Sequence, residues 1–100
     1  MYDIEWSKEA EADLEALAVF RRPPVVTAVE GLRHDAEVET RNRKPLRRVL
    51  PRLPSAEWNL RVGDVRVLYR ISERPAVHIL RVIIKGTSTT DEALARSAKP

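Results

Sequence analysis

The sequence has no cysteine, few aromatic residues and few glycines, and each shortage excludes a class of protein. Without cysteine there can be no disulfide and no thiolate metal site, which suits a reducing cytoplasm. Five aromatic residues among 100 leave most of the core to aliphatic side chains. The three glycines, Gly31, Gly63 and Gly86, lie far apart, so the chain has no glycine-rich phosphate loop.

Long hydrophobic runs are also missing. No apolar segment approaches the roughly 18 to 20 residues that a membrane-spanning helix needs. The N-terminus lacks the charged and then apolar pattern of a signal peptide. We therefore expect a cytoplasmic protein that does not bind a membrane. A length of 100 residues fits one domain, residues 1–100, with the polar stretch 87–100 as a candidate flexible tail.

Charge is abundant, and the two signs are separated along the chain. Residues 1–20 contain six acids and one base, a balance of −5, whereas residues 41–70 contain nine bases and two acids, a balance of +7. Such separation creates a local positive field that attracts polyanions, even though the net charge is only +3. The alternative interpretation is a solvated surface that is merely rich in arginine.

The apolar pattern predicts an α+β fold. It indicates an N-terminal strand, then two helices joined as a hairpin, then three antiparallel strands that follow one another as a meander. We expect one sheet with the helices packed on one face, and a short, weak C-terminal helix that starts near Asp91. The expected ranges are 2–6 for the first strand, 8–20 and 24–36 for the helices, 58–71 for a strand hairpin that turns at Gly63-Asp64, and 76–85 for the last strand.

The segment 58–71 has one apolar face and one basic face, because side chains in strands alternate. The face expected to be buried, against the helices, carries Trp58, Leu60, Val62, Val67, Tyr69 and Ile71. The opposite face carries Asn59, Arg61, Arg66, Leu68 and Arg70.

The connection over residues 38–55 shows no periodicity and contains three prolines, so we expect no regular element there. A connection of this length is unusual in a small domain unless it has a function. Its basic side chains are candidate phosphate contacts: Arg41, Arg43, Lys44, Arg47 and Arg48.

Metal and nucleophilic catalysis find little support in the sequence. The two histidines, His34 and His78, lie in a helical and a strand pattern without the neighbours that would complete a coordination sphere. We interpret them as a surface residue and a hydrogen-bonded strand residue. No serine or threonine sits in a recognisable nucleophile motif. We therefore expect neither a metal ion nor a cofactor.

Arginine is the remaining candidate for chemistry. Guanidinium groups fixed on strands can stabilise the extra negative charge of a pentacovalent phosphate. RNA supplies its own nucleophile, because the 2′-hydroxyl lies beside the phosphate. The candidates are Arg61, Arg66 and Arg70 on the hairpin with Arg81 and Lys85 on the next strand. The alternative is that these groups pair with a partner's carboxylates or with Glu57, Asp64 and Glu73.

Two strings in the sequence resemble a known family. The string L-R-V-G-D-V-R-V-L-Y-R-I at Leu60–Ile71 follows T-R-N-R-K-P-L-R at Thr40–Arg47. Together they resemble the RelE/ParE superfamily of toxins from type II toxin–antitoxin modules, over about residues 2–86. The G-D-x-R-V-x-Y element is moderately specific, and its combination with the upstream K-P-L-R is more so.

The resemblance implies a cytoplasmic bacterial or archaeal toxin that an acidic antitoxin neutralises by wrapping it with a flexible segment. The RelE branch enters the ribosome and cuts mRNA without metal, whereas the ParE branch inhibits DNA gyrase. Our leading hypothesis is ribosome-dependent cleavage of mRNA, which inhibits translation. The alternatives are a gyrase inhibitor and a catalytically weakened relative that only binds nucleic acid or antitoxin.

The resemblance also assigns residues. Arg66 matches the arginine of the G-D-x-R element and Arg61 the basic position before it, so both are catalytic candidates. The remaining expected RNA or phosphate contacts are Arg43, Lys44, Arg47, Arg48, Arg70, Arg81 and Lys85. The sequence departs from the family where Glu57 and Asn59 replace two lysines of RelE ribonucleases, and it has no tyrosine after Tyr69. Lys85 is a candidate substitute for a cation missing beyond the last strand.

Overall fold

The computed structural model describes residues 1–85 and 89–97. Over these residues the elements follow in the α+β order expected, with one additional strand. No helix among them is long and apolar enough to span a bilayer. The elements are β1 (Asp3–Trp6), α1 (Lys8–Ala16), a 3₁₀ turn η1 (Val19–Arg21), α2 (Arg22–Asp35), β2 (Arg43–Pro45), β3 (Trp58–Val62), β4 (Val65–Ser72), β5 (Ala76–Ile84) and α3 (Thr90–Ser97).

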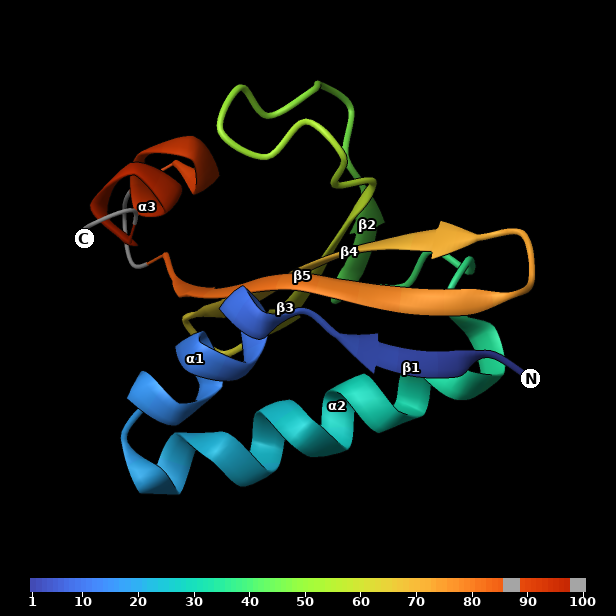
Figure 1. Cartoon of the computed structure of the whole chain (residues 1–100), viewed down its shortest axis with the longest axis horizontal. Helices are drawn as coiled ribbons and strands as arrows, with labels where there is room; N and C mark the ends of the chain where they lie inside the picture. The colour runs from blue at the N-terminus through green and yellow to red at the C-terminus, as the bar shows by residue number, and fades with distance from the viewer. Residues whose placement is uncertain (86–88, 98–100) are drawn as a thin grey trace.

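The described strands form one five-stranded sheet in the order β1-β5-β4-β3-β2 (Figure 1). Strands β3, β4 and β5 pair antiparallel in sequence, which confirms the predicted meander. Strand β1 lies parallel to β5 at one edge, and β2 lies antiparallel to β3 at the other. The register places Leu60 opposite Val67 and Arg61 opposite Arg66. Apolar and basic residues of the hairpin therefore point to opposite faces, as predicted.

The main hydrophobic core lies between the sheet and the two helices α1 and α2, which Figure 1 shows together on one side of it. Tyr69 is fully buried at its centre, where its hydroxyl donates a hydrogen bond to the carbonyl oxygen of Ala36 at 2.7 Å. The Tyr69 ring stacks on Trp58 across the strand pair, with centroids 6.0 Å apart. Helix α2 contributes the apolar face expected of it through Val25, Val29 and Leu32, and Ala36 at its C-cap is buried with them.

The opposite face of the sheet, which we call the outer face, carries a second and smaller cluster. Leu68 of β4 and Ile83 of β5 pack there against α3, which lies on the side away from α1 and α2 (Figure 1). The expected weak C-terminal helix is present, and its Ala93 and Leu94 are almost fully buried. Residues 87, 88 and 98–100 of the expected flexible tail lie outside the described residues.

The first helix is shorter than its periodicity predicted. It ends at Ala16 rather than at residue 20, because Leu17 adopts an extended conformation and enters the core. Arg22 caps the free end of the helix, where its guanidinium donates to the carbonyl oxygens of Glu15 (2.7 Å) and Leu17 (3.1 Å). Helix α2 then begins with Pro23-Pro24 in its first turn, where a missing amide costs nothing.

The connection after α2 is more ordered than its prolines suggested. Arg43–Pro45 form the short edge strand β2, which corrects the expectation of no regular element. A proline is compatible with this position because an edge strand leaves one side of its backbone unpaired. Residues 46–56, which we call the basic loop, follow β2 and lie over the outer face (Figure 1). Their half-buried leucines that pack on this face are Leu46, Leu50 and Leu53.

Candidate nucleic-acid interface

The tip of the hairpin brings two arginines together. Gly63 adopts a positive φ of 62°, which lets β3 turn into β4 within two residues. The turn sets the register that places Arg61 directly opposite Arg66 on the outer face. We call these two residues the arginine pair. Two like charges in this position repel one another, so the fold alone gives no reason for them.

Arg66 is held in place by the backbone of the turn. Its Nη1 donates to the carbonyl oxygens of Gly63 (2.8 Å) and Val65 (3.1 Å). Burial lowers the pKa of the Arg66 guanidinium, and the charge of Arg61 lowers it further. An arginine remains a cation despite such a shift. Arg66 is therefore a fixed positive charge whose remaining N–H groups are free to donate.

Arg61 is exposed, and within residues 1–85 and 89–97 its side chain has neither a hydrogen bond nor an ion pair. Arg47 and Arg48 on the basic loop are likewise exposed and without a side-chain partner in that part of the chain. The loop thus turns its leucines inward and these arginines outward. All three guanidinium groups are available to an anionic ligand.

Arg43 has a different role from the phosphate contact that its sequence position suggested. Its side chain is buried, and Nη1 donates to the Asp35 carboxylate at 2.9 Å and to the Asp35 carbonyl oxygen at 2.6 Å. A third bond reaches the carbonyl oxygen of Val38 at 3.3 Å. Arg43 therefore ties β2 to the end of α2 and does not face a ligand.

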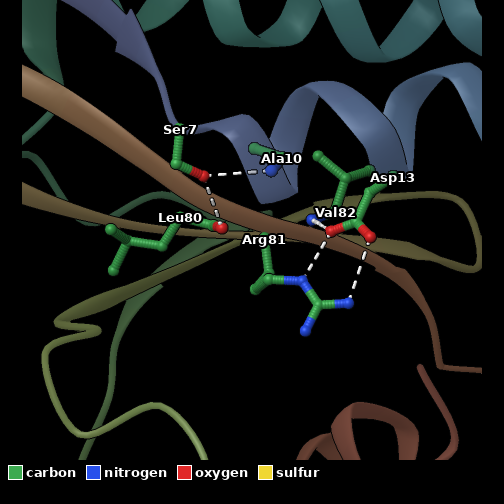
Figure 2. Close-up of polar contacts among 6 residues, drawn as sticks. All are labelled: Ser7, Ala10, Asp13, Leu80, Arg81 and Val82. Atoms are coloured by element: carbon green, nitrogen blue, oxygen red, sulfur yellow. Dashed lines mark hydrogen bonds and ion pairs between the residues drawn. The ribbon is translucent and has the colours of Figure 1, made fainter. Parts of the chain in front are cut away.

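Arg81, another expected phosphate contact, forms an ion pair inside the molecule. Its Nε and Nη2 bind both carboxylate oxygens of Asp13 on α1 at 2.7 and 3.0 Å, as Figure 2 shows. The same carboxylate accepts the backbone N–H of Val82 at 2.9 Å. Ser7, the N-cap of α1, donates through its hydroxyl to the carbonyl oxygen of Leu80 at 3.0 Å. Side chains at the cap and in the second turn of α1 thus complete the edge of β5 beyond the end of β1.

The other expected contacts are spread over the outer face and its edges. Lys44 on β2 is exposed and forms a loose pair with Glu39 at 3.2 Å. Arg70 lies opposite His78, at the end of β4 away from the turn. Lys85 follows β5, and its backbone N–H donates to the carbonyl oxygen of Asp64 at 2.9 Å. The structure therefore brings Lys85 close to the tip and keeps Arg70 apart from it.

The histidines occupy the environments expected of them. His34 is exposed on α2. His78 Nε2 lies 3.0 Å from the Ser72 hydroxyl, and its pKa is lowered by burial and by the charges of Arg70 and Arg74. Over the described residues, no three side chains of the metal-binding types converge on a common point.

None of the acids proposed as partners of the basic face forms an ion pair with it among the described residues. Asp64 pairs with Arg21, whose hydrogen bond lowers the pKa of that carboxyl. Glu57 accepts the backbone N–H of Ile71 at 3.0 Å. Glu73 has no ion pair within the described residues. Within the described chain no carboxylate forms an ion pair with either member of the arginine pair, and Asp64 acts on Arg66 only through its charge.

The chemistry open to this site is electrostatic. Two adjacent guanidinium groups on rigid strands can bind the oxygens of a phosphodiester and stabilise added negative charge on them. The nearest carboxyl, Asp64, is a weak base because Arg21 holds its pKa below the ordinary value. A substrate that carries its own nucleophile suits such a site best.

The sequence did not reveal the contacts that separate arginines bound to a carboxylate from arginines without such a partner. Asp13 and Arg81 are 68 positions apart, and no local pattern links them. The only available signal was that Asp13 lies in the second turn of an otherwise amphipathic helix. The Arg21–Asp64 pair joins η1 to the strand turn and gave no signal either.

The five-stranded sheet with two helices on one face is the fold of small toxins of the RelE/ParE type. The family described as "ParE toxin of type II toxin-antitoxin system, parDE" matches residues 4–86. The chain therefore belongs to the ParE toxins of type II toxin–antitoxin systems, within the RelE/ParE superfamily.

Solved structures agree with this assignment. The toxin–antitoxin complex RelBE2 from Mycobacterium tuberculosis contains a chain 32% identical, with a TM-score of 0.65, over 81% of this chain and 94% of that one. The RelE–RelB complex from Pyrococcus horikoshii matches at 18% identity and a TM-score of 0.67, over 87% and 98% of the two chains. An arginine double mutant of the E. coli toxin RelE in the free state matches at 16% identity and a TM-score of 0.65, over 98% of each chain. The last two likenesses show the fold alone. No curated protein sequence matches this chain.

Proposed function

We propose that this toxin stops translation by cleaving mRNA on the ribosome without a metal ion. The observation that carries the proposal is the arginine pair, two like charges placed opposite one another with no carboxylate bound to either side chain among the described residues. Adjacent cations on neighbouring strands lower stability in the absence of a ligand. A polyanion is the ligand that would reverse this cost.

The reaction that suits the pair is attack by the 2′-oxygen of RNA on the adjacent phosphorus. A bond forms between that oxygen and phosphorus, the bond to the 5′-oxygen breaks, and a cyclic phosphate and a 5′-hydroxyl result. The 2′-hydroxyl proton passes to water, and the leaving 5′-oxygen takes one from water. Arg66, oriented by the carbonyl oxygens of Gly63 and Val65, would stabilise the charge on the pentacovalent phosphate. Arg61 would act beside it.

The wider basic surface would hold the RNA strand. Arg47 and Arg48 on the basic loop, with Lys44 at the sheet edge and Lys85 near the tip, present charge around the pair. Arg70 lies farther along the outer face and would contact the strand at a distance from the cut. Arg43 and Arg81 have no part in this proposal, because carboxylates inside the fold already bind them.

We infer that the chain has a cytoplasmic antitoxin partner that is acidic and amphipathic. Support comes from the related RelBE2 and RelE–RelB structures, which are toxin–antitoxin complexes. Carboxylates of such a partner would meet the same unmatched arginines and block RNA from reaching them. A neighbouring reading frame that encodes a small acidic protein is the expected genomic context, and its absence would count against the proposal.

A second candidate function is inhibition of DNA gyrase, the activity that the sequence resemblance attaches to the ParE branch. The observation in its favour is that the matching family is described as ParE toxin. The positions of the RelE lysines also hold Glu57 and Asn59, and the Glu57 carboxylate is bound to the Ile71 backbone. The same two residues would suit a weakened relative that binds without cutting.

One experiment separates these functions. The chain is expressed alone, as wild type and as Arg66→Ala, and the cells are scored for protein synthesis and for the DNA damage response. We expect growth arrest with rapid loss of translation, and its relief by Arg66→Ala in a protein that still folds. A DNA damage response with continuing translation would select gyrase, and no arrest at all would select the binding relative.

A further inference from the structure

The turn between α2 and β2 presents a third arginine next to the pair. Thr40 and Arg43 exchange backbone hydrogen bonds at 2.8 and 3.2 Å, which makes Arg41 and Asn42 the two central residues of a tight turn. The carbonyl oxygen of Asn42 accepts the backbone N–H of Arg61 at 2.7 Å. The turn is thereby fixed against β3 beside the arginine pair.

Arg43 is the residue that keeps this turn in position. Its buried guanidinium is anchored by Asp35 and by the carbonyl oxygen of Val38, so the chain on either side has little freedom. The side chain that looked like a phosphate contact in the sequence therefore acts as the anchor. Arg41, two positions earlier, is the side chain that faces solvent.

A polar pocket lies where the turn meets the sheet. Its volume is about 540 Å³, and it is lined by Ala28, Arg41, Asn42, Arg61, Val62 and Gly63. It sits beyond the last residue pair of β2 and β3 and next to the hydrogen bond between Arg61 and Asn42. A space of this size and lining accommodates a nucleotide unit with its phosphate between two arginines.

The acids around the pocket are already occupied. Asp35 is bound to Arg43, Glu39 to Lys44 and Asp64 to Arg21. Neither Arg41 nor Arg61 has an ion pair in residues 1–85 and 89–97. The pocket consequently carries two positive charges that this part of the chain does not neutralise.

We propose that Arg41 and Arg61 form a phosphate subsite that holds the RNA strand one step away from Arg66. Arg61 links the other two, since it is paired opposite Arg66 in the hairpin and lines the same pocket as Arg41. One phosphate sits between Arg66 and Arg61, and the neighbouring phosphate sits between Arg61 and Arg41. The subsite rests on the proposed function, because it assumes that the ligand of the pair is single-stranded RNA.

The test measures binding without cleavage. The probe is a fluorescein-labelled RNA hexanucleotide with 2′-O-methyl sugars, which lacks the attacking hydroxyl, and anisotropy is recorded over a series of salt concentrations. We expect Arg41→Gln to weaken binding about 3- to 10-fold and to reduce the slope of log affinity against log salt by about 0.7, the share of one phosphate on a single strand. Arg41→Lys keeps the charge and should keep the slope.

The matched control is Arg74→Gln, which removes the same charge from an exposed arginine that pairs with Glu5 on β1. This substitution should change RNA affinity by less than about twofold and leave the salt slope unchanged, because Arg74 lies outside the proposed phosphate subsite. Equal effects of Arg41→Gln and Arg74→Gln, or no salt-dependent binding by the wild type, would overturn the subsite. Thermal unfolding of each variant shows that the fold is intact. The assay contains no ribosome and involves no cleavage. The subsite can therefore be refuted while the toxin still arrests translation, and the subsite can be supported even if translation is not the target.

Discussion

The edge of β5 and the tip of the β3–β4 hairpin both carry arginine, yet they use it in opposite ways. On β5, Arg81 meets Asp13 in a bidentate pair in which each side chain is 15% exposed. At the tip, Arg61 and Arg66 face one another and the nearest acid, Asp64, is bound to Arg21. The comparison teaches that an arginine's function here depends on whether the fold places a carboxylate beside it.

Removal of Asp13 should disrupt the ion pair on β5 and cause the largest loss of stability among these variants. Asp13→Ala leaves the guanidinium of Arg81 and the N–H of Val82 without their acceptor in a largely dry place. We expect the free energy of unfolding to fall by about 3 kcal/mol, measured by urea denaturation. Glu11→Ala on the same helix is the control, and its side chain is exposed, so it should change stability by less than about 0.5 kcal/mol. Equal losses would mean that the Asp13 pair is not structural.

Asp35→Ala tests whether the buried Arg43 serves the exposed Arg41. Arg43 would keep its two carbonyl acceptors, and Asp35 is itself 47% exposed, so we expect a loss of about 1 kcal/mol. Hydrogen exchange at the Thr40 and Arg43 amides should become faster, and RNA affinity should drop although Asp35 faces no ligand. Unchanged exchange at those amides would show that Arg43 does not anchor the turn.

Arg61→Gln tests the hairpin tip, because it should raise stability while it lowers RNA affinity. Loss of one of two facing cations should raise the free energy of unfolding by about 0.2 to 1 kcal/mol. RNA affinity should fall at the same time. A variant that loses stability would instead show that Arg61 supports the fold.

The smallest expected effect is the pH dependence of stability that His78 on β5 causes. In the folded chain the pKa of His78 lies below the ordinary histidine value of 6.5, because burial and the charges of Arg70 and Arg74 disfavour the protonated ring. Glu5 lies 3.4 Å from Nδ1, but Arg74 already holds that carboxylate. The unfolded chain therefore binds the proton first, and stability should decline as the pH falls through 6.5. His78→Gln should flatten the stability profile between pH 7 and 5, and an unaltered slope would refute the assignment.

The hairpin and the meander could be predicted from the sequence because strand alternation is local. Trp58, Leu60, Val67 and Tyr69 occupy the buried face expected of them, and Arg66 lies on the other. Strand β2 could not be predicted, since its three residues are ordered by pairing with β3 and by the buried Arg43.

The candidate site was predicted less completely than the fold. The family motif pointed to Arg61 and Arg66, but nothing local distinguished these from Arg43 and Arg81. That distinction depends on Asp35 and Asp13, whose side chains meet the arginines only after α1 and α2 pack on the sheet. Long-range ion pairs leave no periodic signal, so the sequence could not show which arginines already have a carboxylate partner inside the fold.

The most direct test of the account is the rate at which the purified toxin cuts mRNA bound to ribosomes, with Arg66→Gln compared with the wild type. We expect cleavage by the wild type that leaves a 5′-hydroxyl, and a rate reduced by roughly 10² to 10³ in the variant, the usual effect of losing one preorganised donor. Both proteins should unfold at similar temperatures. Cleavage at the same rate by Arg66→Gln, or none by the wild type, would contradict the claim that the unmatched arginine pair is the functional site.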